Sequence, residues 1–318
     1  MKLSPLSPRP LVSVVTPSYN QASFLDTTIR SVLEQDYPSV EYFVMDGASS
    51  DGSVDVIRKY ADRLRGWVSE KDRGQGDAIN KGLARTKGEI VAWLNSDDYY
   101  LPKAISSAVK TFKQNPEAAL VYGNMLAVDE DGKTFNTLNY KQLTLEDLLC
   151  FQIIGQPAVF MRRSALQSAG GLDPTFHFML DHHLWIRIAQ QGKIFHADQT
   201  WSAARYHAEA KNIAQAAEFG RDAFRILDAV AQDENLAPTL AKVNRRARAS
   251  AYRVDARYLL DGGQPASALS AWMSALFIHP PTALARMNIF VSAILNLFGL
   301  GKLRSAILNK RKARHQTD

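Results

Sequence analysis

The sequence predicts an α/β fold with a mostly parallel sheet, and two observations lead to this prediction. Four short apolar runs of strand length alternate with stretches of helical apolar spacing over residues 11–98. A polar loop follows each run. This alternation produces parallel strands joined by right-handed crossovers, with ligands bound at the carboxyl edge of the sheet. We therefore expect the functional residues in the loops after the strands.

The predicted elements follow one another in a regular order. Strands are expected at 11–16, 42–45, 66–69 and 90–94, and helices at 24–33, 54–60 and 77–84. Beyond residue 98 the pattern predicts a helix at 102–114, a strand at 118–123, a hairpin around 130–133, a short helix at 145–149, a strand at 156–163 and a helix at 181–189. From residue 212 the sequence is alanine-rich and helical, with one tetratricopeptide-like helix pair between Tyr252 and Pro280. We therefore predict an α/β domain at 1–210 and a C-terminal helical region at 211–318.

The composition is that of a globular protein with about two domains. The chain has 318 residues, of which 46% are hydrophobic and 22% are charged. Its single cysteine, Cys150, cannot form an intramolecular disulfide, so the cysteine content does not indicate residence in an oxidising compartment. Residues 1–10 lack the apolar core of a signal peptide. We therefore expect a cytoplasmic protein.

The net charge of +6 does not predict nucleic-acid binding, because residues 302–318 carry +5 of it. Before this basic tail lies an apolar stretch, 287–300, which as a helix would reach about 21 Å, short of the roughly 30 Å hydrocarbon core of a bilayer. Two alternatives stay open for residues 286–318. The segment lies in the plane of the membrane at its inner face, or it is buried on the protein or in a homodimer.

The acidic pair Asp97-Asp98 directly follows the fourth predicted strand, at the sheet edge where ligands bind. Two adjacent carboxylates repel each other unless a positive charge lies beside them, and a divalent cation chelated by a diphosphate supplies such a charge. The pair therefore indicates a metal-nucleotide site. The alternative is a solvated turn before Pro102.

The common phosphate-binding loops do not occur in the sequence. No Gly-x-Gly-x-x-Gly follows the first strand and there is no P-loop, which disfavours dinucleotide-binding and P-loop proteins. Instead, Tyr19 follows the first strand and Asp46 the second. A tyrosine ring can stack on a base, and a carboxylate can accept a hydrogen bond from the imide N–H of uracil or thymine. The alternatives are a packing role for Tyr19 and a turn-forming role for Asp46.

Four motifs together resemble those of a known family. They are VVTPSYN (14–20), MDGASSDGS (45–53), SEKDRGQGDAINKG (69–82) and LNSDD (94–98). In this order and spacing they resemble the motifs of family-2 inverting glycosyltransferases of the GT-A fold, over about residues 10 to 208. The resemblance implies a nucleotide-sugar donor, a divalent cation (Mn²⁺ or Mg²⁺) and sugar transfer with inversion at the anomeric carbon.

The resemblance also assigns residues to the donor and the metal. The donor-binding residues would be Pro17, Tyr19 and Asp46 around the nucleobase, Arg73 and Asp77 near the nucleotide and sugar, and Asp97 at the ribose. Asp98 matches the acid that holds the metal. His207 stands where the family often has a histidine near the diphosphate or metal, and its alternative is a half-buried structural histidine. Asn95 departs from the family's commonest pattern, in which an acid stands there.

Asp181 matches the catalytic base of the family, which accepts the proton of the acceptor hydroxyl. Its alternative role is to cap the helix at whose start it lies. Leu180 replaces the acid that usually precedes the base. His182 and His183 point about 100° apart on a helix and do not suit one metal ion, so we interpret them as acceptor-pocket or surface groups.

The function predicted from the sequence is therefore metal-dependent, inverting transfer of a sugar. The donor would be a nucleotide-diphospho-sugar, by preference a UDP-sugar, and the acceptor a glycan or lipid-linked molecule in cell-surface polysaccharide or glycolipid assembly. One alternative is a non-catalytic scaffold that binds nucleotide sugars. A nucleotidyltransferase is disfavoured because the first strand lacks a Gly-rich basic loop after it.

Overall fold

The computed structural model of the chain describes residues 3, 5–207 and 216–300. It divides into two compact units. One comprises Met1–Leu148 and Gln152–His207, and the other comprises Leu149–Phe151 and Ala208–Asp318. The first unit is built on a sheet, whereas residues 216–300 of the second form helices and the turns between them.

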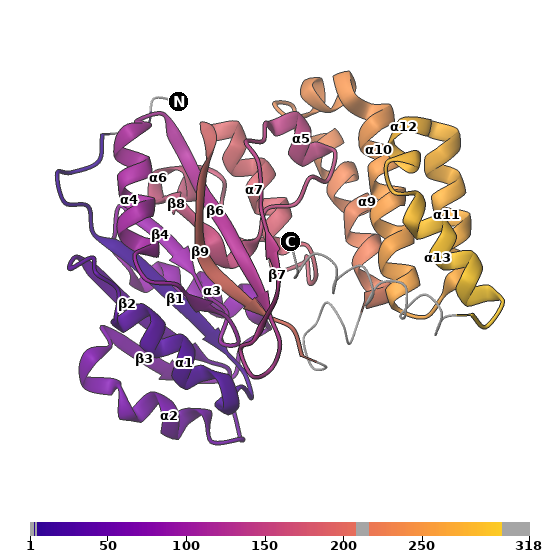
Figure 1. Cartoon of the computed structure of the whole chain (residues 1–318). Helices are drawn as coiled ribbons and strands as arrows, with labels where there is room; N and C mark the ends of the chain where they lie inside the picture. The colour runs from indigo at the N-terminus through magenta and orange to yellow at the C-terminus, as the bar shows by residue number, and fades with distance from the viewer. Residues whose placement is uncertain (1–2, 4, 208–215, 301–318) are drawn as a thin grey trace. The chain divides into compact units, whose positions relative to one another are not determined.

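The sheet of the first unit has nine strands in the order β3-β2-β1-β4-β8-β6-β9-β5, with β7 paired to β6 (Figure 1). Its parallel part consists of β1 (Val12–Ser18), β2 (Val40–Asp46), β3 (Gly66–Ser69) and β4 (Ile90–Trp93). The carboxyl ends of these four strands therefore meet at one edge, as the alternation in the sequence predicts.

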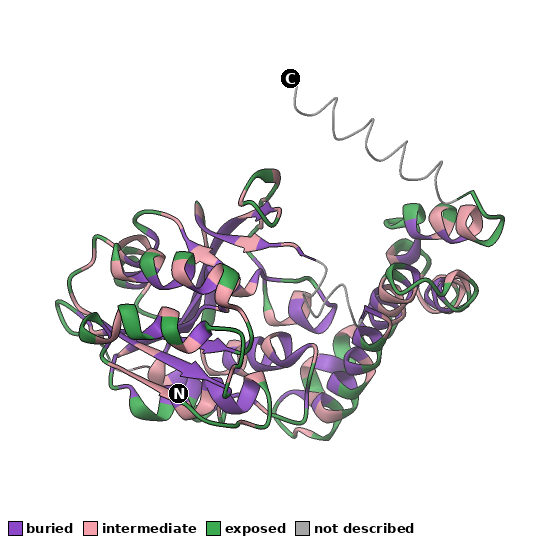
Figure 2. Ribbon diagram, turned by 90° about the horizontal axis from the view of Figure 1, so that it is seen from below, coloured by how far each residue is buried: buried purple, intermediate pink, exposed green. Residues whose placement is uncertain are grey.

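Helices cover both faces of the parallel strands. On one face α1 (Ala22–Leu33), α2 (Ser53–Lys59) and α4 (Ala104–Gln114) share a core with alternate strand residues such as Val14. On the other face lies α3 (Gln75–Arg85), so close that a Cβ added to Gly82 would come within 2.4 Å of Val15 Cγ1. Neighbouring strand residues point to opposite faces, so Val14 and Val15 serve two different cores. The buried residues accordingly concentrate along the strands (Figure 2).

The rest of the sheet is mixed. β6 (Ala118–Val128) pairs antiparallel with β7 (Thr134–Leu138) and β8 (Val159–Arg162), and parallel with β9 (Lys193–Arg205). β5 (Tyr99–Tyr100) pairs antiparallel with β9. The sequence patterns do not predict β5 or β9. The register of β9 against β6 shifts at three places, so its buried residues show no regular alternation.

Short helices connect the strands of this mixed part. They are α5 (Leu145–Leu149), α6 (Arg163–Ser168) and α7 (Leu180–Gln191). An added Cβ on Gly76, at the start of α3, would lie 3.9 Å from Leu180 Cδ1. The first turns of α3 and α7 are therefore neighbours.

The second unit contains α9 (Ala216–Gln232), α10 (Ala237–Asp261), α11 (Pro265–Ile278), α12 (Pro280–Leu284) and α13 (Met287–Leu297). A cluster around Trp272 joins α10 to α13, and Trp272 Nε1 donates to Ala283 O at 3.2 Å. The segment Leu149–Phe151 belongs to this unit through Arg253 Nη2, which donates to Phe151 O at 3.2 Å. Among the residues described, no helix has the length and apolar character needed to cross a membrane.

Candidate active site

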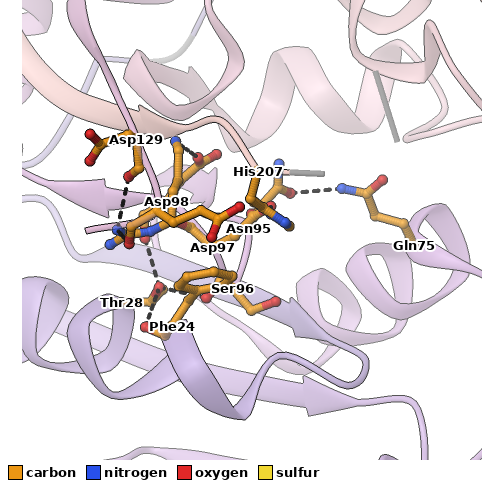
Figure 3. Close-up of polar contacts among 11 residues, drawn as sticks. Phe24, Thr28, Gln75, Asn95, Ser96, Asp97, Asp98, Asp129 and His207 are labelled. Carbon is orange, nitrogen blue, oxygen red and sulfur yellow. Dashed lines mark hydrogen bonds and ion pairs between the residues drawn. The ribbon is translucent and has the colours of Figure 1, made fainter. Parts of the chain in front are cut away.

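The acidic pair Asp97-Asp98 lies at the carboxyl end of β4, and a residue of α1 contacts the backbone of its loop. The buried hydroxyl of Thr28 lies 2.8 Å from Ser96 O and 2.7 Å from Asp98 O, which it can reach as a donor (Figure 3). Thr28 on α1 thereby fixes the backbone on both sides of Asp97. The Asp98 side chain is buried as well, which disfavours a merely solvated turn at this position.

Arg205, at the end of β9, holds the same loop from the other side. Its backbone N–H donates to Asp98 Oδ1 at 3.0 Å, and its Nε donates to Asp97 O at 3.1 Å. Its Nη1 donates to Glu130 O at 2.6 Å in the β6–β7 turn. The guanidinium stacks over the Phe24 ring, 4.8 Å from the centroid. The sequence analysis did not identify Arg205, because β9 itself was not predicted.

Burial raises the pKa of Asp98 well above its ordinary value, and the negative charge of Asp97 raises this pKa further. The hydrogen bond from Arg205 N–H and the Arg205 charge offset part of the effect. The carboxylates therefore lie where an added positive charge would be stabilised.

Carboxylate oxygens such as those of Asp97 and Asp98 are ligands that suit a hard cation such as Mn²⁺ or Mg²⁺. Asn95 Oδ1 accepts a hydrogen bond from Gln75 Nε2 at 2.7 Å, which links the loop to α3. Among the residues described, no group of three or more His, Cys, Asp or Glu is arranged to hold a metal ion.

His207 contacts the first acid of the pair. Its Nε2 lies 3.1 Å from Asp97 Oδ2, and its ring lies 4.9 Å from that of Phe24 (Figure 3). The ring is buried. The structure thus brings His207 to the predicted metal site, in contact with Asp97.

Two other predicted donor residues, Asp46 and Tyr19, lie at the ends of β2 and β1. The Asp46 carboxylate is buried and accepts hydrogen bonds from Ser49 N at 3.0 Å and Ser69 Oγ at 2.6 Å. Tyr19 is 64% exposed, so it has no core-packing role. Pro17 lies buried within β1, where it is paired in register with Met45 of β2. The three residues therefore gather at the carboxyl ends of two neighbouring strands.

Arg73 and Asp77 form one unit at the start of α3. The Asp77 carboxylate accepts hydrogen bonds from Arg73 Nη2 at 2.9 Å and from Arg73 N at 3.1 Å. These bonds, and then the bond from Lys81, hold the pKa of Asp77 well below its usual range. The side chain of Arg73 is 81% exposed, whereas that of Asp77 is buried. The buried acid therefore orients an arginine that faces solvent.

Asp181 lies in the first turn of α7. The helix begins after Met179, so the interpretation of Asp181 as the N-cap is wrong. Its Oδ1 nevertheless accepts a hydrogen bond from His182 N at 2.7 Å. Burial raises the pKa of Asp181 to about 6, which is suited to a group that takes up a proton near neutral pH. Because Leu180 approaches Gly76, the first turn of α7, which contains Asp181, lies beside the first turn of α3, which contains Asp77.

The two histidines after Asp181 are buried, which corrects their interpretation as surface groups. His182 Nε2 lies 2.9 Å from Leu148 O, and burial lowers the pKa of His182 to about 4. The His183 ring packs on Phe176, with centroids 4.1 Å apart. Helix α7 is buried on nearly all sides, so the two side chains lie in the protein interior although they point in different directions.

The geometry around Arg205 leads to a first prediction. Lysine keeps the charge and the backbone N–H, but it cannot bond Asp97 O and Glu130 O together, so Arg205→Lys should lower the free energy of unfolding by about 1–3 kcal/mol. Donor affinity should fall with it, because the Asp97-Asp98 loop loosens. Urea unfolding and donor titration measure the two effects. Arg30→Lys, at an exposed ion pair on α1, is the control; equal behaviour of the two variants would contradict the prediction.

Comparison with known proteins shows the family to which the chain belongs. The model of glycosyl transferase family 2 matches residues 13–170. TuaG of Bacillus subtilis (strain 168), named as a teichuronic acid biosynthesis glycosyltransferase, is 30% identical over 190 residues, covering 58% of this chain and 74% of TuaG. A glycosyltransferase of Rickettsia bellii (strain RML369-C) is 27% identical over 210 residues, 63% of this chain but 30% of that relative. The chain thus spans about a third of the length of several relatives that it matches.

Solved structures show the same fold. Mannosyltransferase PcManGT from Pyrobaculum calidifontis, in complex with GDP-Man and Mn²⁺, has a TM-score of 0.63 at 20% identity, covering 97% of this chain and 90% of that one. TarS 1–349 of S. aureus, in complex with UDP-GlcNAc, has a TM-score of 0.60 at 16% identity, covering 93% and 92%. The fold is therefore the GT-A fold of glycosyltransferases. The chain belongs to glycosyl transferase family 2.

Proposed function

We propose that the protein is a metal-dependent, inverting glycosyltransferase that moves a sugar from a nucleotide-diphospho-sugar to a glycan or lipid-linked acceptor. The observation that supports the proposal is the buried Asp98 beside Asp97: burial and the Asp97 charge both raise the pKa of Asp98, so a bound cation would stabilise the pair of carboxylates. TuaG supports polysaccharide assembly as the setting, and the chondroitin synthase of Pasteurella multocida, 28% identical over 193 residues, supports it too. Glycolipid assembly is the second biosynthetic process that we propose for the enzyme.

The reaction we propose is a single in-line displacement. Asp181 accepts the proton of the acceptor hydroxyl, whose oxygen forms a bond to the anomeric carbon while the bond to the nucleoside diphosphate breaks. A divalent cation at Asp98, with Asp97 and His207 beside it, would supply positive charge to the leaving diphosphate. The exposed guanidinium of Arg73, which is paired with Asp77, would donate to the same anion.

Asp46 and Tyr19 support a uridine nucleotide as the donor. The buried Asp46 carboxylate, fixed by Ser49 and Ser69, can accept one more hydrogen bond from an imide N–H. The exposed Tyr19 ring can stack on the base. Pro17 lies buried in β1, two positions before Tyr19. Asp97 would contact the ribose. We therefore propose a UDP-sugar, although one solved neighbour holds GDP-Man.

The domain roles and the location remain proposals. We assign catalysis to residues 1–210 and propose a cytoplasmic protein that acts at the inner face of the membrane, alone or as a homodimer. A non-catalytic scaffold is disfavoured because Asp98 and Asp181, whose absence would have supported it, are both present.

A donor screen tests the proposal directly. Thermal unfolding of the full chain would be measured with UDP-, GDP- and dTDP-sugars, each with and without Mn²⁺. A UDP-sugar with Mn²⁺ should raise the melting temperature, because a ligand at 100 times its Kd stabilises by about 2.7 kcal/mol. Stabilisation by none of the three classes would overturn the proposed function, and stabilisation without Mn²⁺ to the same degree would remove its metal dependence.

Tyr19 offers a second prediction. Tyr19→Ala should weaken UDP binding by about tenfold, since stacking on a base is worth about 1–3 kcal/mol, and should leave the melting temperature unchanged because the ring is exposed. Tyr19→Phe is the matched control, which keeps the aromatic face and should bind normally. Calorimetric titration with UDP compares the three proteins. Unchanged affinity of Tyr19→Ala would place the base elsewhere.

A further inference from the structure

Exposed large apolar side chains are concentrated at the end of the described chain. Among the residues described, all of them except Tyr19 and Ile153 lie between residues 277 and 300. Phe277 is 78% exposed and Phe298 is 75% exposed. Isolated exposed apolar residues are normal, but a concentration of this kind marks an interaction surface.

Helix α13 has two apolar faces, of which one is buried and the other is largely exposed. Ile289 and Ala293 are buried in the cluster around Trp272, whose ring lies 4.8 Å from Phe290. Met287, Val291, Ile294 and Phe298 recur at helical spacing on the opposite face, where three of them are exposed and Ile294 is half-buried. We name these four residues the outer stripe. The inner face thus anchors the helix to its unit, and packing within that unit leaves the outer stripe largely uncovered.

The charged residues that neighbour the outer stripe in the sequence all have one sign, and those after residue 300 lie outside the described part of the chain. From residue 262 to residue 317 the sequence contains no Asp or Glu. Its charged residues in this range, leaving histidines aside, are Arg286, Lys302, Arg304, Lys310, Arg311, Lys312 and Arg314. An apolar stripe flanked by basic residues alone complements a surface that offers apolar chains under anionic headgroups.

We propose that the outer stripe of α13 inserts into the interface of an anionic lipid bilayer, with the flanking basic residues on the headgroups. The helix lies in the membrane plane, because its inner face is already buried in protein and cannot turn to lipid. A second copy of the chain is the poorer partner, since a symmetric contact would bring two acid-free basic segments together. The inference does not depend on the proposed sugar transfer.

Vesicle sedimentation of the full-length protein tests the proposal. Vesicles of phosphatidylcholine with about one third phosphatidylglycerol should bind the protein, and pure phosphatidylcholine vesicles should bind it much less, because each basic residue near a charged surface contributes about 1 kcal/mol. The double variant Val291→Asp, Phe298→Asp should bind the anionic vesicles at least about tenfold less. Val291→Asp alone should also bind less, and Ile153→Asp, the same single change at an exposed apolar residue outside the helical unit, is its matched control and should bind like the unchanged protein.

Three outcomes would overturn the inference. Failure of the unchanged protein to bind anionic vesicles, or equal binding by the double variant, would exclude a role of the outer stripe in lipid binding. Sedimentation velocity gives the third outcome: a dimer that the double variant converts to monomer, without vesicle binding, would assign the stripe to a second copy. Thermal unfolding monitors folding, and a triple change of Lys310, Arg311 and Lys312 to Gln supplies a second test that leaves α13 intact. This change should weaken binding to anionic vesicles only.

Discussion

Asp181→Asn should lower sugar transfer by about two to four powers of ten, the usual contribution of a positioned base, while donor binding survives. The amide keeps the shape of the side chain and can still accept the hydrogen bond from His182 N, but it cannot take up the acceptor's proton. Transfer and UDP affinity would be measured on the same preparation. Asp173→Asn is the control, because the Asp173 carboxylate is held by Thr175 and should tolerate the change.

The pH dependence gives the same variant a second readout. With a pKa of about 6, Asp181 should lose its base function below pH 6, so kcat/KM of the unchanged protein should fall about tenfold for each further pH unit. Because the pKa of Asp181 is raised on folding, the protonated side chain contributes stability at pH values below the pKa of an aspartate in the unfolded chain. This contribution is lost as the pH rises through the pKa of Asp181 in the folded protein. Asp181→Asn should therefore be as stable as the unchanged protein or more stable at pH 7 to 8, with the difference shrinking toward about pH 4.

These two readouts separate chemistry from structure. A purely structural Asp181 would give a variant with a lower melting temperature and nearly normal turnover per folded molecule. Normal turnover in a stable variant would mean that the base lies elsewhere, and His183, two residues further along α7, would be the next residue to change.

Asp98→Ala should abolish metal-dependent donor binding without unfolding the protein. The buried carboxylate has a raised pKa, so its charged form already costs stability, and its removal relieves the repulsion from Asp97. What the alanine loses is the acceptor for Arg205 N–H. Asp98→Asn keeps that acceptor and loses only the charge, which makes it the sharper variant.

Calorimetry with UDP, in the presence and absence of Mn²⁺, measures this effect. We expect the unchanged protein to bind UDP far more tightly with Mn²⁺ and both Asp98 variants to show no such difference. If Asp98→Asn retains the Mn²⁺ effect in full, Asp98 does not hold the cation.

The sequence was informative wherever a short strand ran straight into a polar loop. The residues after β1, β2, β3 and β4 follow that pattern, so both the parallel half of the sheet and the positions of Asp46 and Asp98 could be predicted from it. Helix boundaries were predicted to within a few residues, because the apolar spacing of α1, α3 and α4 is regular.

Local patterns failed where long-range pairing decides the structure. Strand β9 contacts β6 across repeated register shifts, and its exposed and buried residues follow no simple period. Thr28 and Gln75 likewise act through partners that are 20 or more residues away, namely Asp98 O and Asn95. Thr28 lies outside the four motifs, and the motif at 69–82 that contains Gln75 does not indicate its partner, so these contacts are evident only from the structure.

The bond between Arg205 N and Asp98 Oδ1 joins residues that are 107 positions apart in the chain. At a synthesis rate of about 5–20 residues per second, roughly 5–20 s pass between the synthesis of Asp98 and that of Arg205. Parallel pairing of β9 with β6 is also slow to form, because its contacts are distant in sequence. A ribosome-bound chain that ends before β9 should therefore have strands β1 to β4 in place, but an Asp97-Asp98 loop that lacks its hydrogen bonds from Arg205.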